Sequence, residues 1–153
     1  PSVIIADEPT TALDVTIQAQ IIAEVQKLAA ETGTAIVWVT HDLAVVSGLS
    51  DRLAVMYAGR IIEEGVTDDV LGRPHHPYTQ GLLHSLPINN QRGRRLNQIP
   101  GATPSLLNLP QGCAFAPRCT ERQTDCERGS IAQTLDRDGR RWACLHPVNG
   151  GAH

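Results

Sequence analysis

Aromatic residues are scarce in this sequence, and no apolar run is long enough to cross a membrane. Only 3% of the 153 residues are aromatic, and no stretch approaches the roughly 20 apolar residues that a transmembrane helix needs. No basic segment followed by an apolar stretch and a cleavage site opens the chain. Any association with a membrane is therefore expected to come through a partner. The length suffices for the core of one domain.

Lysine is almost absent, and charge is unevenly distributed. Lys27 is the one lysine in the chain. Residues 1–91 carry 11 acidic against 4 basic residues (−7), and residues 92–153 carry 5 against 9 (+4), which sums to the net charge of −3. A basic region can indicate a nucleic-acid partner. Here the arginines alternate with acidic residues and have only Phe115 and Trp142 as aromatic neighbours, so no nucleic-acid partner is expected.

The first 40 residues carry the pattern of a β-α-β unit. Residues 2–7 are predicted to form a buried strand and residues 34–39 a second strand parallel to it. Between them, Asp14 is the expected helix N-cap and Gly33 the expected C-terminal stop. The predicted apolar face of this helix consists of Ile17, Ile21, Val25 and Leu28. Because the chain begins directly in a strand, it is expected to be a piece of a longer protein.

Further elements follow from turn and cap signals. A short helix is predicted to end near Leu49, and residues 52–57 and 60–64 are predicted strands joined by a tight turn at Ala58-Gly59. Thr67 is the expected cap of another short helix. Pro77 is expected in the first turn of a helix with Tyr78, Leu82 and Leu86 on one face. Residues 88–111 lack periodicity and are predicted to form a linker.

Two adjacent carboxylates, Asp7 and Glu8, follow the first predicted strand. Adjacent carboxylates repel each other, so a structural role would rarely require both. His41 follows the next strand, and the carboxyl ends of parallel strands meet where α/β proteins bind ligands. Asp7 is placed to hold Mg²⁺ on a nucleotide, and Glu8 to orient a water against a γ-phosphate. The alternatives are a solvated strand end for the acids and a core or cap role for His41.

The order of these motifs resembles that of the Walker B, D-loop and H-loop elements in the nucleotide-binding domains of ABC transporters. The matching runs are Asp-Glu-Pro-Thr at 7–10, Ala-Leu-Asp at 12–14 and Val-Thr-His-Asp at 39–42. The resemblance implies an α/β fold, the C-terminal part of a P-loop NTPase (RecA-like) parallel sheet with flanking helices. It implies ATP and Mg²⁺ as cofactors, with Asp7 near Mg²⁺ and with Glu8 and His41 as catalytic residues. Asp14 would lie at a dimer interface, opposite the partner's Walker A loop.

Three elements of that family are missing. The sequence contains no glycine-rich loop of the form G-x-x-x-x-G-K-S/T, no Q-loop glutamine region and no L-S-G-G-Q-type signature. In the family all three precede the Walker B strand. The chain is therefore expected to be the C-terminal portion of such an ATPase and to hydrolyse no ATP by itself. The open edge of its first strand is also expected to make the isolated chain poorly soluble or oligomeric.

The downstream sequence narrows the resemblance to the oligopeptide and dipeptide importer ATPases. Residues 51–65 are similar to the hairpin that closes the ABC ATPase sheet, and His76-Pro77-Tyr78 and residues 99–101, 104–106 and 112–119 resemble the importers' C-terminal extension. The resemblance implies an ATPase subunit for uptake of peptides or nickel, peripheral at the cytoplasmic face of the inner membrane. The implied partners are a second ATPase subunit, the transmembrane permease subunits and, indirectly, an extracytoplasmic substrate-binding protein. Three regions are expected: 1–72, 73–110 and a cysteine-containing, loop-rich extension, 111–153.

The four cysteines point to a metal or cluster site without deciding which. Cys113, Cys119, Cys126 and Cys144 are spaced C-x5-C-x6-C-x17-C, with no C-x-x-C pair of the zinc-ribbon kind. Four thiolates suit a four-iron, four-sulfur cluster, and importer relatives with such a tail are associated with one. Zinc, with His146 replacing one cysteine, and unliganded thiols or disulfides are the alternatives. Three arginines could offset the charge of a cluster: Arg118, Arg122 and Arg128.

Two other functions remain open from the sequence. One is the ATPase half of a soluble DNA-repair or chromosome protein, since such proteins also carry an Asp-Glu pair and a histidine. The other is a stand-alone interaction module that binds a metal or cluster and whose ATPase remnant is inert.

Overall fold

The computed structural model describes residues 1–86 and 97–148. It has a mixed α/β fold with two small sheets, and the chain divides into two compact units, residues 1–50 and residues 51–153. Each unit is described by itself below. None of the helices in the described part of the chain combines the length and hydropathy needed to span a bilayer.

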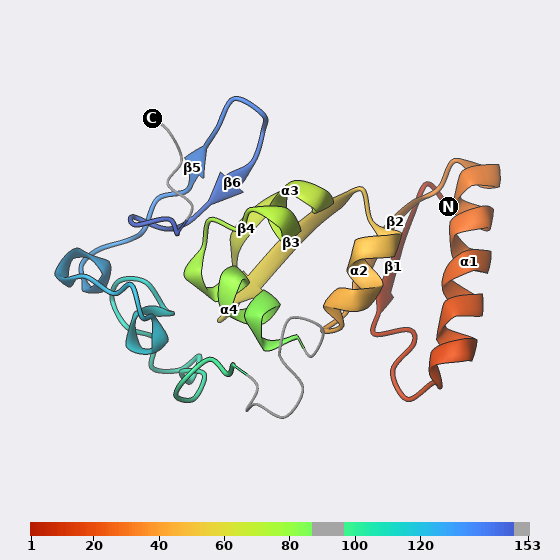
Figure 1. Cartoon of the computed structure of the whole chain (residues 1–153). Helices are drawn as coiled ribbons and strands as arrows, with labels where there is room; N and C mark the ends of the chain where they lie inside the picture. The colour runs from red at the N-terminus through yellow and green to blue at the C-terminus, as the bar shows by residue number, and fades with distance from the viewer. Residues whose placement is uncertain (87–96, 149–153) are drawn as a thin grey trace. The chain divides into compact units, whose positions relative to one another are not determined.

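The first unit is the predicted β-α-β arrangement. β1 (Val3–Asp7) and β2 (Ala35–Val39) pair in parallel, with Asp7 opposite Val39 at the carboxyl ends of both strands. α1 (Val15–Thr32) connects them and lies beside the strand pair in Figure 1. α2 (Leu43–Leu49) follows β2, with Asp42 as its N-cap.

The ends of α1 confirm the predicted cap residues. The Asp14 carboxylate accepts hydrogen bonds from the backbone N–H groups of Thr16 and Ile17, both at 3.0 Å, and so satisfies donors that the first helical turn leaves unpaired. Gly33 has φ 65° in the left-handed region, and its N–H donates to the carbonyl of Ala29. Glycine adopts this conformation without the steric cost that a Cβ brings.

Burial in the first unit differs from the prediction. β1 was predicted to be buried, but Val3, Ile4 and Ile5 are 53%, 44% and 73% exposed. On α1, Ile17 and Leu28 are also exposed. Ile21 and Val25 of the predicted face are half-buried, together with Gln18, Ile22 and Ala29. The reason is that two strands present too narrow a surface to cover the whole predicted stripe.

The second unit begins with a hairpin. β3 (Arg52–Tyr57) pairs antiparallel with β4 (Arg60–Val66), two residues longer than predicted. The turn residues Ala58 and Gly59 both have positive φ, 48° and 78°, the combination of a type I′ turn. The predicted turn is therefore confirmed.

Two short helices follow the hairpin. α3 (Thr67–Gly72) has Val66 as its N-cap, so the prediction that Thr67 caps this helix was wrong, and Thr67 is its first residue. α4 (Pro77–Ser85) begins with Pro77, as predicted, because proline lacks the N–H that a first helical turn leaves unpaired. Leu86 is the C-cap of α4 and lies beyond its apolar face.

The residues after α4 add two strands that the sequence did not signal. β5 (Thr134–Leu135) and β6 (Arg141–Trp142) extend the hairpin into a sheet of order β3-β4-β6-β5. Two 3₁₀ helices precede them, η2 (Ala116–Arg118) and η3 (Thr124–Glu127). Of the predicted linker, residues 88–96 lie outside the described residues, and residues 97–111 contain no helix or strand. The division at 72 and 110 stays a prediction.

The core of the second unit is built around three aromatic rings. Tyr57 and Tyr78 have ring centroids 4.6 Å apart, and each lies 5.3 Å from Phe115. Val55, Ile62 and Val70 complete the buried cluster. Aromatic pairs contribute about 0.5–1.5 kcal/mol each beyond the area they bury, so Tyr78 anchors α4 as the sequence predicted.

Candidate functional site

The carboxyl ends of β1 and β2 bring the predicted catalytic residues together. Glu8 follows β1 directly, has φ 45° and donates its backbone N–H to the carbonyl of Val39 at 2.9 Å. His41 lies two residues beyond Val39. Its Nδ1 is 2.9 Å from Glu8 Oε1, and the Thr11 hydroxyl donates to the other carboxylate oxygen at 3.1 Å.

These contacts define the charge of Glu8. The hydrogen bond from His41 lowers the pKa of Glu8, as does the weaker one from Thr11, because both donors stabilise the carboxylate. Glu8 is therefore an ionised acceptor at neutral pH. The two side chains stay accessible, 46% exposed for Glu8 and 75% for His41, so a ligand can reach both.

The side chains of Asp7 and Asp14 differ in exposure and in hydrogen bonding. Asp7 is exposed at the end of β1, directly beside Glu8. The Asp14 carboxylate is occupied in capping α1. The loop between them is held by Gln18, whose amide donates to the buried Thr10 hydroxyl at 3.2 Å. The edge thus offers two adjacent carboxylates and an imidazole, groups able to hold a hard cation and to orient a water.

A second candidate site is a pocket in the second unit. All four cysteines line it, as do His76, Phe115 and His146. Residues 31 positions apart in the sequence therefore meet around one space. The sequence predicted a common site for the cysteines, and the structure brings them together.

Close backbone packing places two of these cysteines. The Cys113 N–H donates to the Cys126 carbonyl at 2.8 Å. A Cβ on the preceding Gly112 would lie 2.1 Å from that same carbonyl oxygen, far inside contact distance. Only glycine therefore allows this approach without moving the backbone.

Burial in the pocket favours the uncharged form of three of the thiols. Burial raises the pKa of Cys113, Cys119 and Cys144, the last to about 12. Backbone N–H groups near the sulfurs oppose this shift, for example that of His146 at Cys144. A metal bound here would have to displace the protons, because only thiolates are good ligands.

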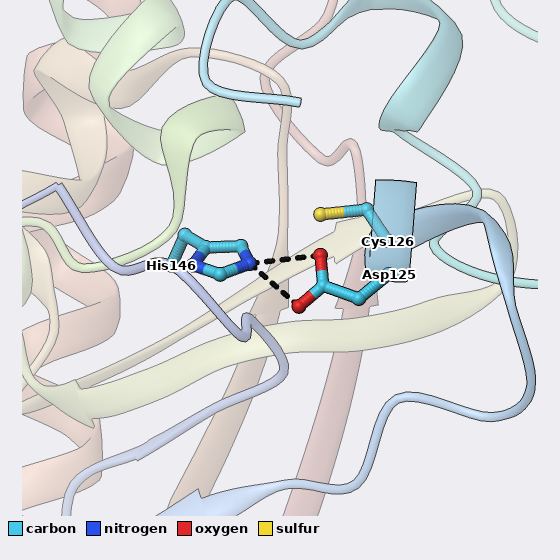
Figure 2. Close-up of side chains that lie close together, drawn as sticks. All are labelled: Asp125, Cys126 and His146. Atoms are coloured by element: carbon cyan, nitrogen blue, oxygen red, sulfur yellow. Dashed lines mark hydrogen bonds and ion pairs between the residues drawn. The ribbon is translucent and has the colours of Figure 1, made fainter. Parts of the chain in front are cut away.

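One group of three potential ligands lies beside the pocket. Figure 2 shows His146 directed at the Asp125 carboxylate, with the Cys126 thiol close by. His146 Nε2 lies 2.9 Å from each carboxylate oxygen, and this contact lowers the pKa of Asp125. The ligand atoms of the three residues lie within 4.8 Å of one another, a spacing that among the described residues no other such group reaches.

This spacing bears on the kind of metal. A tetrahedral zinc site with Zn–S bonds of about 2.3 Å requires sulfurs about 3.8 Å apart. The four sulfurs line one pocket but form no group within 4.8 Å. Among the described residues, only Asp125, Cys126 and His146 place three potential ligand atoms close enough for a single ion.

Two of the three arginines near the cysteines, Arg118 and Arg122, have other contacts. Arg118 donates to the Pro100 carbonyl at 2.8 Å and to the Thr103 hydroxyl at 3.2 Å. Arg122 lies 3.4 Å from Glu127. Their role in offsetting the charge of a cluster stays a prediction.

A buried ion pair near the pocket was missed by sequence reasoning. The Glu63 carboxylate accepts the backbone N–H groups of His75 and His76 at 2.7 and 2.9 Å, and Arg140 donates to it at 2.6 Å. Arg140 also donates to the carbonyl of Arg73. No local pattern could reveal this pair, because its partners lie 77 positions apart.

The chain is similar to known transport proteins. Residues 62–126 match the family described as the C-terminal region of oligopeptide/dipeptide transporters. A peptide import ATP-binding protein of Brucella ovis is 56% identical, with 78% of this chain aligned to 37% of the relative. The oligopeptide transport ATP-binding protein OppD of Salmonella typhimurium is 47% identical (97% of this chain, 44% of the relative). The dipeptide transport ATP-binding protein DppD of Bacillus subtilis is 46% identical (94% and 43%).

These relatives are longer than the chain, which spans between 37% and 44% of their length. All three are named as ATP-binding proteins of peptide import or transport. The resemblance noted from the sequence is thereby confirmed, and the DNA-repair and stand-alone-module alternatives are not favoured.

Proposed function

We propose that the chain, whose residues 62–126 match the C-terminal region of oligopeptide/dipeptide transporters, is the C-terminal part of the ATP-binding subunit of an ABC importer for di- or oligopeptides. The observation that carries the proposal is the edge at which Asp7, Glu8 and His41 meet. We further propose that β1 and β2 belong to the larger parallel sheet of a P-loop NTPase. The exposed apolar residues of β1 support this, since a central strand would bury them.

The edge supports distinct roles for its three side chains. Mg²⁺ bound to ATP would supply charge neutralisation of the phosphates, and the Asp7 carboxylate, a hard oxygen ligand, would hold that ion. Glu8 is ionised and accessible, so it can accept a hydrogen bond from a water and orient it. Its lowered pKa makes it a weak base, which favours orientation over proton abstraction. His41 donates from Nδ1 to Glu8, so its Nε2 could donate to a phosphate oxygen only in the doubly protonated ring.

The partners follow from the same proposal. A second ATP-binding subunit would face Asp14, whose carboxylate already holds the start of α1 rigid. Permease subunits would bind the chain at the cytoplasmic face of the membrane, and the extracytoplasmic substrate-binding protein would act through them. Whether the cargo is a dipeptide, an oligopeptide or nickel depends on those subunits.

ATP hydrolysis by the intact protein that contains this chain tests the proposal. Glu8→Gln is expected to reduce the rate about 10²-fold, the order of loss when a reacting group is no longer held in position. Glu24→Gln, an exposed carboxylate on α1, serves as the matched control and should leave the rate unchanged. The 153-residue chain by itself is expected to show no turnover, because it lacks the glycine-rich loop. Wild-type hydrolysis in the Glu8→Gln protein would refute the assignment.

We also propose that the four-cysteine pocket holds a thiolate-bound metal group, a four-iron, four-sulfur cluster before zinc. All four thiols line one pocket, which supports a shared ligand. No three of the sulfurs lie within 4.8 Å of one another, which supports a cluster over a single zinc ion. The four residues that would hold it are Cys113, Cys119, Cys126 and Cys144. Its role would be structural, linking η2, η3 and β6, because the aromatic-poor tail has few apolar side chains of its own.

Metal and acid-labile sulfide analysis of anaerobically purified intact protein tests this second proposal. Iron and sulfide in equal amounts would support the cluster, and zinc without sulfide would support the alternative at Asp125, Cys126 and His146. Cys144→Ser should reduce the bound metal in either case through the loss of a ligand or of the pocket's shape. A protein that retains neither metal would refute the site.

A further inference from the structure

His76 is buried and held in one orientation. Its side chain is 1% exposed, and its Nδ1 accepts the backbone N–H of Tyr78 at 3.0 Å, which makes it the N-cap of α4. The Glu63 carboxylate fixes the same segment by accepting the His76 N–H. The ring therefore has little freedom to turn.

This hydrogen bond also determines where the imidazole carries its proton. A backbone N–H can only donate, so Nδ1 must present a lone pair, and the neutral ring carries its hydrogen on Nε2. Burial lowers the pKa of His76 to about 4, although the Glu63 charge opposes the shift. The neutral tautomer with an Nε2–H donor is thus the form present at neutral pH.

That donor has no partner within the described part of the chain. His76 Nε2 is buried and makes no hydrogen bond, and His76 lines the pocket that the four cysteines share. Buried donors are nearly always paired in native proteins, so an unpaired one needs an explanation. Besides the cysteines, the pocket is lined by Phe115, whose ring centroid lies 5.9 Å from that of His76, and by the polar residues Glu121 and His146.

We infer that His76 Nε2–H donates a hydrogen bond to a sulfur of the thiolate-bound group in the four-cysteine pocket. The inference rests on the proposed metal role of the cysteines. An N–H donor directed at a thiolate or sulfide stabilises its negative charge, and hydrogen bonds to the sulfurs are among the factors that set cluster reduction potentials. His76 is then a positioning residue that holds and tunes the group without ligating it.

Each residue of the His-Pro-Tyr run, residues 76–78, has a structural role. His76 caps α4 with Nδ1, and on this inference its Nε2–H donates into the pocket. Pro77 starts the helix, and Tyr78 packs into the aromatic core. The run thereby couples the pocket to the core of the second unit. None of these roles requires contact with the transported substrate.

Two substitutions test the roles of Nδ1 and Nε2 of His76 separately. In His76→Asn, the amide oxygen can still cap α4 in place of Nδ1, but no donor reaches the position of Nε2. In His76→Gln, the longer amide can reach that position as a donor, but the cap is lost. His84→Asn, an exposed histidine on the same helix, is the matched control.

The measurements use the intact protein, purified anaerobically and reconstituted with ferrous iron and sulfide. They are the midpoint potential of any cluster, and the retention of iron or zinc against a chelator. We expect His76→Asn to shift the potential to more negative values, because the reduced form loses a stabilising donor. We also expect it to retain the metal about 10–100-fold less tightly, the usual effect of losing a residue that supports a ligand. His76→Gln should stay near the wild-type potential, and His84→Asn should match the wild type.

The outcomes distinguish this inference from the proposed site. Metal retention and potential unchanged in His76→Asn would overturn the inference and leave the cysteine site standing. If only zinc is bound, the chelator assay decides alone, and unchanged retention overturns the inference. A wild-type protein that binds neither metal would overturn both. If His76→Asn does not fold, a negative shift or weakened retention in folded His76→Gln would contradict the assigned role of Nε2.

Discussion

Glu63 and Arg140 form a salt bridge in which both side chains are buried, 0% and 7% exposed. Each charge depends on the other and on the backbone groups around them. Arg141, next in the sequence, pairs with Glu64 at 3.2 Å but is 50% exposed. Solvent screens the second pair, so the two adjacent arginines are expected to contribute differently to the free energy of unfolding.

Replacing these arginines one at a time tests that difference. Arg140→Ala leaves the Glu63 charge buried without its cationic partner, and we expect the free energy of unfolding to fall by about 3–5 kcal/mol. Arg141→Ala should cost no more than about 1 kcal/mol. Urea denaturation of the intact protein, followed through the second unit, measures both. Equal losses of stability in the two variants would show that burial does not determine the contribution of the Glu63–Arg140 pair.

The hydrogen bond between His41 and Glu8 makes a prediction about titration. Because the folded structure lowers the pKa of Glu8 below 4.5, we expect His41→Ala to move it upward, toward that ordinary value. The sign for stability follows: the contribution of Glu8 is present above the unfolded pKa and is lost as pH falls through the lower folded value. Carboxyl ¹³C chemical shifts recorded against pH measure it. An unchanged titration of Glu8 in His41→Ala would contradict the contact.

At the scale of the elements, the turn between β3 and β4 depends on backbone conformation. Ala58 and Gly59 both adopt positive φ, and no atom lies within 4 Å of where a Cβ on Gly59 would be. A side chain there meets no steric obstacle from neighbours. Any cost of adding one thus comes from the backbone itself.

Gly59→Ala isolates this cost. We expect it to destabilise the second unit by about 1–2 kcal/mol, the penalty of the left-handed conformation for a residue with a Cβ. Gly72→Ala at the end of α3 is the control, since it also has open space but no positive φ and should cost nothing. Thermal unfolding of both variants provides the comparison, and equal midpoints would contradict the type I′ assignment.

The elements also show which features local sequence can specify. Asp14, Gly33 and Pro77 were identified correctly because caps and turns satisfy backbone groups only a few residues away. The buried side of α1 was not, since it depends on what packs against the helix. The same applies to β5 and β6, whose pairing with β4 involves residues far apart in the chain.

At the scale of the whole molecule, the first unit presents an apolar sheet face to solvent. Val3, Ile5, Val37 and Val39 lie on one face of the strand pair and are 53%, 73%, 50% and 44% exposed. Exposed β-rich apolar surface promotes association. In the intact protein we propose that other parts of the ATPase cover this face.

We therefore expect the 153-residue chain alone to self-associate. The double variant Ile5→Thr, Val37→Thr keeps the β-branched shape but removes apolar area from the face, and it should shift the chain toward monomer. Val15→Thr, at an 81% exposed position on α1, is the control and should not. Sedimentation velocity at several concentrations distinguishes these cases. A monodisperse wild-type monomer would contradict the expectation.

The sequence by itself determined the kind of protein and the chemistry of its parts. The order of Asp7-Glu8, Asp14 and His41 and the presence of four cysteines are local facts that no packing alters. Only the tertiary structure decided that His41 contacts Glu8, that the cysteines share a pocket, and that His76 lines the same pocket with a buried Nε2 that makes no hydrogen bond. These facts depend on contacts between residues 30 or more positions apart, because long-range packing follows from the shape of the whole fold and not from any run of neighbours.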